Sequence, residues 1–260
     1  SNGSSRTFAG TTGTIFYMCG NISSNTTASD PAQRGTVRFS CTVNFECYNN
    51  PINVSGQMQP WACGNMFNGC TRLVKAPDLP NTILADRCYR NIFYGCTSLT
   101  NAPELPATTI PAGAYDSMFR NCTSLVEVSE LPATTVGEYS YSCMFMGCTS
   151  LVNPPEILPA TILVTNCYYY MFANCSRLVK TPVLPAPSLP SMCYYYMFEN
   201  CYNLEYVKCL AIQKTSNSTS YWLRNVKNTG TFIKAAGMEN WPRDISGIPA
   251  NWTVIDDTEE

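Results

Sequence analysis

The feature that most constrains the fold of this chain is a side-chain pattern that recurs every 26 residues in its middle part. One cysteine per period marks the pattern, with a single step of 27 residues. This cysteine column consists of Cys70, Cys96, Cys122, Cys148, Cys175 and Cys201. Phenylalanine lies three residues before each of these cysteines, and leucine lies three residues after it. A fixed period of about 20–50 residues with an apolar consensus is typical of solenoids, whose stacked units share one continuous core.

Each unit combines two kinds of local signal. In residues 111–120, apolar residues four positions apart predict a short helix. A glycine or asparagine column predicts a helix end with positive φ, and it reads Gly69, Gly95, Asn121, Gly147, Asn174 and Asn200. A strand of about three residues follows, because proline then interrupts it in most units. The fold class predicted from these signals is an α/β solenoid of about six 26-residue units with short parallel strands and short helices, capped at both ends.

The flanks of the repeat predict two caps. Residues 1–59 contain the strand-like stretches 14–18 and 36–45, and residues 211–260 carry three tryptophans without a clean repeat. An open solenoid end would expose its core, so atypical terminal segments are expected. We therefore predict three parts: a β-rich N-terminal cap at 1–59, the solenoid at 60–210 and a C-terminal cap at 211–260.

Composition excludes several functional classes. The chain has no histidine, so neither a Ser-His-Asp site nor a histidine-bearing zinc site can form within it. The net charge is −2, which provides no global basic field for a nucleic acid. No uninterrupted apolar stretch approaches the length of a transmembrane helix. Residues 1–5 carry no basic and apolar leader, so we expect a mature product, a fragment or a leaderless chain.

The cysteines and carboxylates are expected to be structural. A second small-residue column takes cysteine, alanine or serine, which favours packing over obligatory bridges; it reads Ala62, Cys88, Ala114, Ser140, Cys167 and Cys193. We expect mostly free, buried thiols and neither a metal nor a cofactor. One or two disulfides remain open among Cys19, Cys41, Cys47, Cys63, Cys143 and Cys209. An acidic column is expected to be a solvated rim, with a calcium ladder as the alternative; it consists of Asp78, Glu104, Glu130 and Glu156.

Two surfaces are candidates for binding. Tyr169, Tyr170, Tyr195 and Tyr196 fall in columns that hold polar residues in other units, which predicts an exposed aromatic cluster on the helical side. Packing under the C-terminal segment and self-association are the alternatives. The outward strand column is mixed and polar. Such a surface suits recognition of a partner, but any solvent-exposed strand face has the same composition. The column reads Lys75, Asn101, Glu127, Asn153, Lys180 and Tyr206.

The unit consensus Cys-Tyr-x-x-Met-Phe-x-Gly-Cys-Thr-Ser-Leu-x-x-Ala-Pro-x-Leu-Pro-Ala-Thr-Thr resembles the BspA-like leucine-rich repeats of Bacteroidetes surface proteins. The match is clear in residues 88–109 and recognisable in 167–187. The stretches 230–234 and 247–254 resemble the segment that closes such arrays. The resemblance implies an exported, curved leucine-rich repeat solenoid that serves adhesion or recognition without catalysis.

Together these observations favour an exported, non-catalytic binding or adhesion protein that recognises an extracellular protein or glycan. Abundant free thiols favour an anaerobic exterior or a reducing cytosol. Together with the resemblance, they lead us to expect the cell surface or the secretions of an anaerobic bacterium. The alternative is a structural or receptor-binding part of a larger assembly, such as a phage tail or filament, with the tyrosines as the assembly contact. An enzyme is the least favoured class, because only the carboxylate column supports it.

Overall fold

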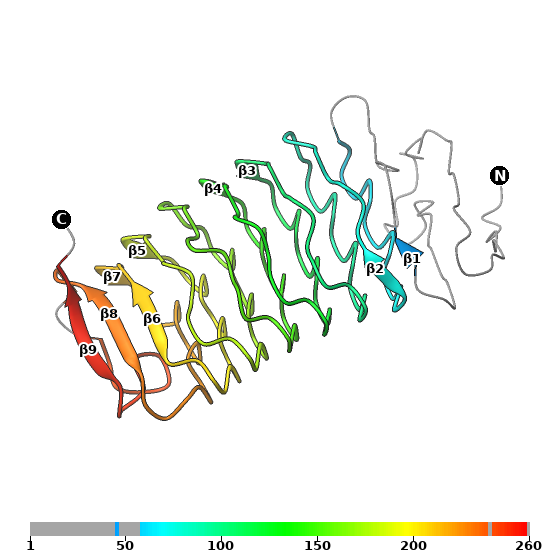
Figure 1. Cartoon of the computed structure of the whole chain (residues 1–260). Helices are drawn as coiled ribbons and strands as arrows, with labels where there is room; N and C mark the ends of the chain where they lie inside the picture. Colours follow the sequence, from blue (N-terminus) through cyan, green and yellow to red (C-terminus); the bar gives the residue numbers. More distant parts are fainter. Residues whose placement is uncertain (1–44, 47–57, 239–240, 259–260) are drawn as a thin grey trace.

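The structure is a computed structural model that describes residues 45–46, 58–238 and 241–258. Figure 1 shows the units as successive coils of one elongated stack, in sequence order from β1 to β9. Corresponding segments of neighbouring units lie side by side, and all strand pairs are parallel. The predicted parallel solenoid is therefore confirmed. The predicted N-terminal cap, with Cys19, Cys41 and Cys47, lies almost entirely outside the described residues.

The strands are short, as the proline column predicted. They are β1 (Phe45–Glu46), β2 (Leu73–Lys75), β3 (Thr109–Ile110), β4 (Thr135–Val136), β5 (Ser188–Leu189), β6 (Tyr206–Cys209), β7 (Gln213–Lys214), β8 (Thr231–Ala235) and β9 (Thr253–Asp257). They form the ladders β1–β2, β3–β4, β5–β7 and β6–β8–β9. Single parallel bridges such as Asn101 with Glu127 and Glu127 with Asn153 continue the pairing between these strands. The ladder of β6, β8 and β9 carries the stacking through the C-terminal part of the chain.

The prediction of short helices is wrong. No helix occurs in the described residues, and each predicted helix is instead a run of overlapping β-turns, which we call the turn ribbon. Within the ribbon, positive φ recurs every fourth residue, as at Gly113, Ser117 and Asn121. The predicted glycine and asparagine column does have positive φ at all six positions. It marks the last turn of a ribbon, where the sequence suggested the end of a helix.

The hydrogen bonds explain why the ribbon replaces a helix. Amide groups alternate between two acceptors along each ribbon. Cys88 N–H donates to the carbonyl of Ala85 within its unit at 3.2 Å, whereas Tyr89 N–H donates to Ala114 in the next unit at 3.1 Å. Every second peptide group therefore joins two units, which an α-helix cannot do because its N–H groups bond within the helix. The buried side chains repeat every four residues, so the sequence pattern also fits a helix of 3.6 residues per turn.

Two aromatic columns fill the core. Six phenylalanines stack from Phe67 to Phe198 with ring centroids 5.3–5.7 Å apart. A parallel column of five tyrosines runs from Tyr89 to Tyr194 and ends on Trp222, at separations of 5.5–6.2 Å. All these rings are buried, so packing explains this tyrosine column as expected. Burial of each such side chain contributes about 1.5–3 kcal/mol, and no unit could bury it alone.

The described cysteines are free thiols, as expected, including Cys63, Cys143 and Cys209. Five thiols of the main column donate to the carbonyl of a phenylalanine in the preceding unit. The Cys122 thiol, for example, lies 3.1 Å from the carbonyl oxygen of Phe93, and the same contact recurs at Cys96, Cys148, Cys175 and Cys201. The cysteine thus supplies a small apolar side chain and a weak donor at once.

No helical segment in the part of the chain that the structure describes has the length and hydropathy needed to cross a membrane.

Substitution at Gly95 tests the positive-φ requirement. Gly95 has φ of 70°, and a Cβ atom there would meet nothing closer than 3.9 Å. Gly95→Val should lower the free energy of unfolding by about 1–2 kcal/mol, because only the left-handed backbone penalises the new side chain. Gly95→Asn is the matched control and should change it little, since asparagine occupies this column in other units. Equal losses for the two variants in urea titrations would contradict this explanation.

The buried thiols predict unfolding at alkaline pH. Burial raises the pKa of Cys88, Cys167 and Cys209 to about 12. The pKa of a thiol in an unfolded chain is about 8.5. At a pH between these two pKa values, the thiols are deprotonated in the unfolded chain and still protonated in the folded chain. The free energy of unfolding should therefore fall by about 1.4 kcal/mol per thiol and pH unit above about pH 8.5. Urea midpoints measured from pH 7 to 10 check this, and Cys122→Ala should reduce the slope. A constant midpoint would contradict it.

Candidate functional site

The turn ribbon places the four predicted tyrosines on one face of the solenoid. Tyr170 and Tyr196 occupy positive-φ positions in adjacent units, with φ of 54° at each. Tyr169 and Tyr195 directly precede them. Their side chains are half-buried, so the structure brings the four together but exposes them less than the sequence suggested. Tyr221, with φ of 59°, extends the Tyr170 column into the following unit.

We call these five residues the tyrosine cluster; its rings form two stacked columns. Tyr170, Tyr196 and Tyr221 stack at 4.6 and 4.7 Å between centroids, with interplanar angles of 9° and 15°. Tyr169 and Tyr195 stack at 5.4 Å and 2°. The two columns meet edge to face, at 4.6 Å between Tyr169 and Tyr170 and 4.5 Å between Tyr195 and Tyr196. Both arrangements are favourable for aromatic pairs, and each ring of the cluster contacts at least two others.

An arginine and a carboxylate complete this surface. The Arg224 guanidinium carbon lies 5.1 Å from the ring centroids of both Tyr196 and Tyr221, within cation–π range. The same guanidinium donates a hydrogen bond to the carboxylate of Glu199. That carboxylate is only 7% exposed, so Arg224 balances a buried charge. The hydrogen bond to Glu199 also raises the pKa of Arg224 above its usual value.

Three tyrosines of the cluster have a raised pKa. Burial raises the pKa of Tyr170, and the neighbouring hydroxyls of Tyr169 and Tyr196 raise it further. Burial likewise raises the pKa of Tyr169 and of Tyr196. Tyr169, Tyr170 and Tyr196 therefore keep neutral hydroxyl groups, which donate and accept hydrogen bonds.

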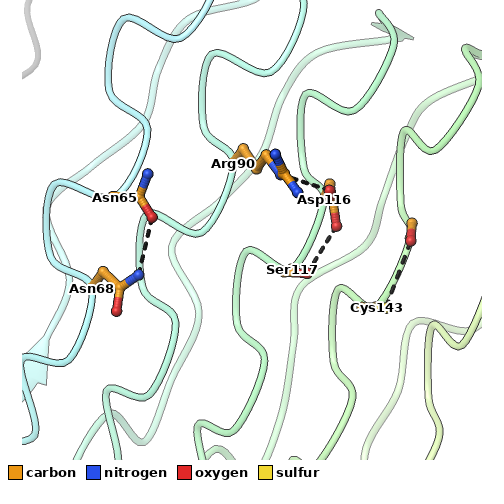
Figure 2. A network of polar contacts seen from close by, with 7 residues as sticks. Asn65, Asn68, Arg90, Asp116, Ser117 and Cys143 are labelled. Carbon is orange, nitrogen blue, oxygen red and sulfur yellow. Dashed lines mark hydrogen bonds and ion pairs between the residues drawn. The ribbon is translucent and has the colours of Figure 1, made fainter. Parts of the chain in front are cut away.

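Earlier units carry polar side chains in the same two columns. Figure 2 shows Arg90 and Asp116, one unit apart, joined by an ion pair of 2.8 Å. Ser117 donates to Asp116 at 2.8 Å, and Ser142 lies 3.6 Å from the sulfur of Cys143. In these two columns the side chains thus change from charged and small polar ones to aromatic ones along the solenoid. The backbone at these positions is the same turn ribbon in every unit. The tyrosine cluster therefore differs from the equivalent positions of earlier units in its side chains alone.

The structure places the second candidate surface on the strand side, away from the turn ribbon. Glu127 bridges Asn101 and Asn153, and Lys180 bridges Tyr206, so the predicted column is in register. Lys75, Glu127 and Lys180 are exposed, whereas Tyr206 is half-buried. Asn101 donates to the Glu127 carboxylate at 3.0 Å. The column is a mixed polar surface without a converging group of side chains.

The acidic column lies in solvent, as expected. Asp78, Glu104, Glu130 and Glu156 are all exposed, and Glu156 N–H donates to the Glu130 carboxylate at 3.0 Å. Among the described residues no group of three or more cysteine and carboxylate side chains is arranged to hold a metal ion.

Sequence reasoning missed Tyr221, Glu199 and Arg224. Tyr221 follows Tyr196 by 25 residues, as Arg224 follows Glu199, whereas the sequence pattern predicts a step of 26 and a solenoid that ends at residue 210. Asn225 gives the missing signal, because it follows Asn200 by the same 25 residues and its amide donates to Asn200 at 2.8 Å. A step of 25 would have placed Tyr221 and Arg224 in their columns, whereas Glu199 already follows Ala173 by 26 residues and no sequence signal marked it.

Stacked coils with short parallel strands and a repeated leucine core define a leucine-rich repeat solenoid. The family model described as "BspA type Leucine rich repeat region" matches residues 62–178 and 86–229 in six copies. The chain therefore belongs to this family, which confirms the resemblance seen in its sequence. Repeats of this type generally mediate protein binding, and such solenoids are typically non-catalytic scaffolds. No curated protein and no solved structure matches the chain.

Removal of Arg224 tests how the buried carboxylate is balanced. Arg224→Ala should lower the urea midpoint, because Glu199 would keep a buried charge without its partner. The double variant Glu199→Ala/Arg224→Ala should recover most of the loss, since Ala173 occupies the same column one unit earlier. Far-ultraviolet circular dichroism during urea titration measures both. A double variant less stable than Arg224→Ala would contradict this assignment.

Proposed function

We propose that the protein is an exported, non-catalytic binding or adhesion protein that recognises a protein partner through the tyrosine cluster. The observation that carries this proposal is the group of five mutually stacked tyrosines beside Arg224, in columns that carry polar side chains in earlier units. Tyrosine and arginine are enriched in the residues that dominate protein–protein binding energy. Tyrosine also provides a large contact area at low cost in conformational entropy.

A glycan partner is less well supported than a protein. Sugars bind aromatic side chains mainly through the faces of the rings. In the tyrosine cluster, Tyr196 has its faces covered by Tyr170 and Tyr221, and Tyr169 stacks on Tyr195. The stacking therefore leaves fewer ring faces for a sugar than five separate tyrosines would.

The strand column is proposed as a second contact surface. Lys75, Glu127 and Lys180 present both signs of charge, and Tyr206 adds an aromatic side chain at the end of the row. Interface rims are polar and solvent-accessible, with few dominant contacts. We expect single substitutions there to change association rates more than affinity.

The proposed location is the cell surface or the secretions of an anaerobic bacterium. Leucine-rich repeat proteins of this type are generally surface-associated. Buried thiols such as Cys96 and Cys122 remain unpaired, and an exterior without strong oxidants would preserve them.

Fractionation tests the location directly. An antibody against the native protein should detect it in the outer-membrane or culture fraction of the source cells and on intact cells by flow cytometry. A cytosolic marker enzyme provides the control for lysis. Detection only together with that marker would overturn the proposed export.

The second candidate function is that of a structural component of a larger assembly, in which the tyrosine cluster forms the assembly contact. Tyr195→Ser tests it, since serine occupies this column at Ser142 and Ser220. Sedimentation velocity of the wild-type protein should then show oligomers that the variant lacks. A wild-type protein that stays monomeric at high concentration would remove the support for this candidate.

A further inference from the structure

A second row of short strands presents an exposed face that the proposed function does not use. β3 and β4 pair in parallel, and Thr135 bridges Ile162 in the next unit. Figure 1 shows β3, β4, β5 and β7 one behind another along one side of the solenoid. In four successive units of this row, two exposed residues precede a buried aliphatic one, and both exposed residues are threonine or isoleucine. We call these residues the threonine–isoleucine face; they are Thr82, Ile83, Thr108, Thr109, Thr134, Thr135, Thr161 and Ile162.

The threonine–isoleucine face is apolar and uncharged although it lies in solvent. Ile83 and Ile162 are 67% and 81% exposed, the largest fractions among the large hydrophobic side chains of the described residues. The threonines between them add methyl groups beside their hydroxyls. Because β-branched side chains are restricted at χ1, they lose little conformational entropy when a ligand covers them. Exposed apolar side chains that gather on one face mark an interaction surface.

The acidic column borders this face. Between Glu130 and Thr134 burial alternates along the chain: Glu130, Pro132 and Thr134 are exposed, whereas Leu131 and Ala133 are buried. Successive side chains of an extended segment point to opposite sides, so the carboxylate, the proline ring and the threonine lie on the same outward side. The two preceding units carry a carboxylate, a proline and a threonine in the same order and spacing. The acidic column therefore runs along the face, with a column of prolines between them.

The acidic column and the threonine–isoleucine face extend over the same four units. In the next unit Val183 replaces the carboxylate, and Pro187 and Ser188 replace the face. No lysine or arginine lies between a carboxylate of the column and the end of the face, in residues 78–83, 104–109, 130–135 and 156–162. Among the described residues, none of these four carboxylates takes part in an ion pair, whereas Asp116 and Glu199 on the turn ribbon pair with arginine. The apolar face thus has a negative border that the described part of the chain leaves unneutralised.

The charge of this border selects the class of ligand. A row of carboxylates without cations repels phosphate groups, which disfavours nucleic acids and anionic membranes. A second copy of the chain that used the same face would bring its own carboxylates, and like charges at an interface are costly. A bare metal ion would leave Ile83 and Ile162 uncovered. A polypeptide that carries both apolar and basic side chains satisfies the face and its border together.

We propose that the threonine–isoleucine face binds a basic, extended polypeptide segment, a function beyond that of the tyrosine cluster and independent of it. The four residues from Glu130 to Thr134 span about 13 Å in an extended chain. A segment that lies over the proline column therefore has the carboxylates on one side and the face on the other. Alternate side chains of an extended segment point to opposite sides, so lysine or arginine can reach the acidic column while apolar side chains cover the face.

Fluorescence anisotropy of a rhodamine-labelled decapeptide of alternating lysine and valine, titrated with the full chain, tests this proposal. The anisotropy should rise with protein concentration. Decapeptides of alternating glutamate and valine, and of alternating lysine and serine, should each bind at least about tenfold more weakly, because one lacks the charge and the other the apolar contact. Binding of the lysine–valine peptide should also weaken as salt is raised, since salt screens exposed charges.

Two variants separate the charge from the apolar contact. Glu104→Gln/Glu130→Gln should weaken binding of the lysine–valine peptide at least about fivefold and reduce its salt dependence. Ile83→Thr/Ile162→Thr should weaken it at least about threefold, because less apolar surface is covered. Threonine already occupies this column in the two units between these isoleucines, so the strand row can keep its backbone.

Asp244→Asn/Ile245→Thr is the matched control. Asp244 is an exposed carboxylate that accepts a backbone N–H from Ser246 at 2.7 Å, as Glu130 accepts one from Glu156 at 3.0 Å. Ile245 is 58% exposed, and both residues lie outside the threonine–isoleucine face. The control should bind the lysine–valine peptide as the wild type does. Circular dichroism and urea midpoints establish that each variant is folded. If a double variant fails to fold, the single substitution Glu130→Gln or Ile162→Thr takes its place.

Four results would overturn the proposal. They are no anisotropy change with the lysine–valine peptide, equal binding of either comparison peptide, unchanged affinity in either folded double variant, and an equal loss in the control. Sedimentation equilibrium adds a fifth, because a wild-type dimer abolished by Ile83→Thr/Ile162→Thr would identify a second copy as the occupant. None of these results concerns the tyrosine cluster or the location of the protein, so the proposed function is tested separately.

Discussion

The structure depends on peptide hydrogen bonds that run from one turn ribbon to the next. In each ribbon every second N–H group points along the solenoid axis and donates to the following unit, as Phe93 does to Met118 at 3.0 Å. These bonds all have the same direction, so their peptide dipoles add along the axis, as they do in a helix. The geometry requires positive φ at every fourth residue, which costs a non-glycine residue about 1–2 kcal/mol. Tyr170 and Cys143 adopt it while their N–H groups donate to the next unit, to the carbonyls of Tyr195 at 2.9 Å and Tyr169 at 2.7 Å.

The same constraint explains the unusual use of cysteine. At the column of Cys96 and Cys122, the side chain lies where a ribbon ends and the chain turns toward the strand side. A thiol there is small enough for a close-packed stack, and it donates to the phenylalanine carbonyl of the preceding unit. The thiol bond runs opposite to the ribbon bonds, so each unit is tied to its neighbours in both directions. The sequence predicted buried thiols correctly from the free exchange of cysteine, alanine and serine in a parallel column.

The error over helices has a definite physical cause. A ribbon of overlapping turns buries residues four apart, as at Ala114 and Met118, and an α-helix buries nearly the same set. Over ten residues the two periods differ by about one residue, which a hydrophobicity pattern cannot resolve. The positive φ at Asn121 was predictable because asparagine tolerates that conformation. The positive φ at Ser117 and Tyr196 was not, because neighbouring units impose it and the local side chain does not favour it.

The sequence alone determined that the chain is a solenoid, which residues form its core and which tyrosines occupy polar columns, because a repeat aligns equivalent positions without any knowledge of the backbone. Tertiary structure decided the direction in which each peptide group bonds and the stacking of Tyr170, Tyr196 and Tyr221. It also brought Arg224 beside these rings through a repeat of 25 residues. Columns are a property of sequence spacing, whereas the partners of a peptide group or an aromatic ring exist only after the units have stacked.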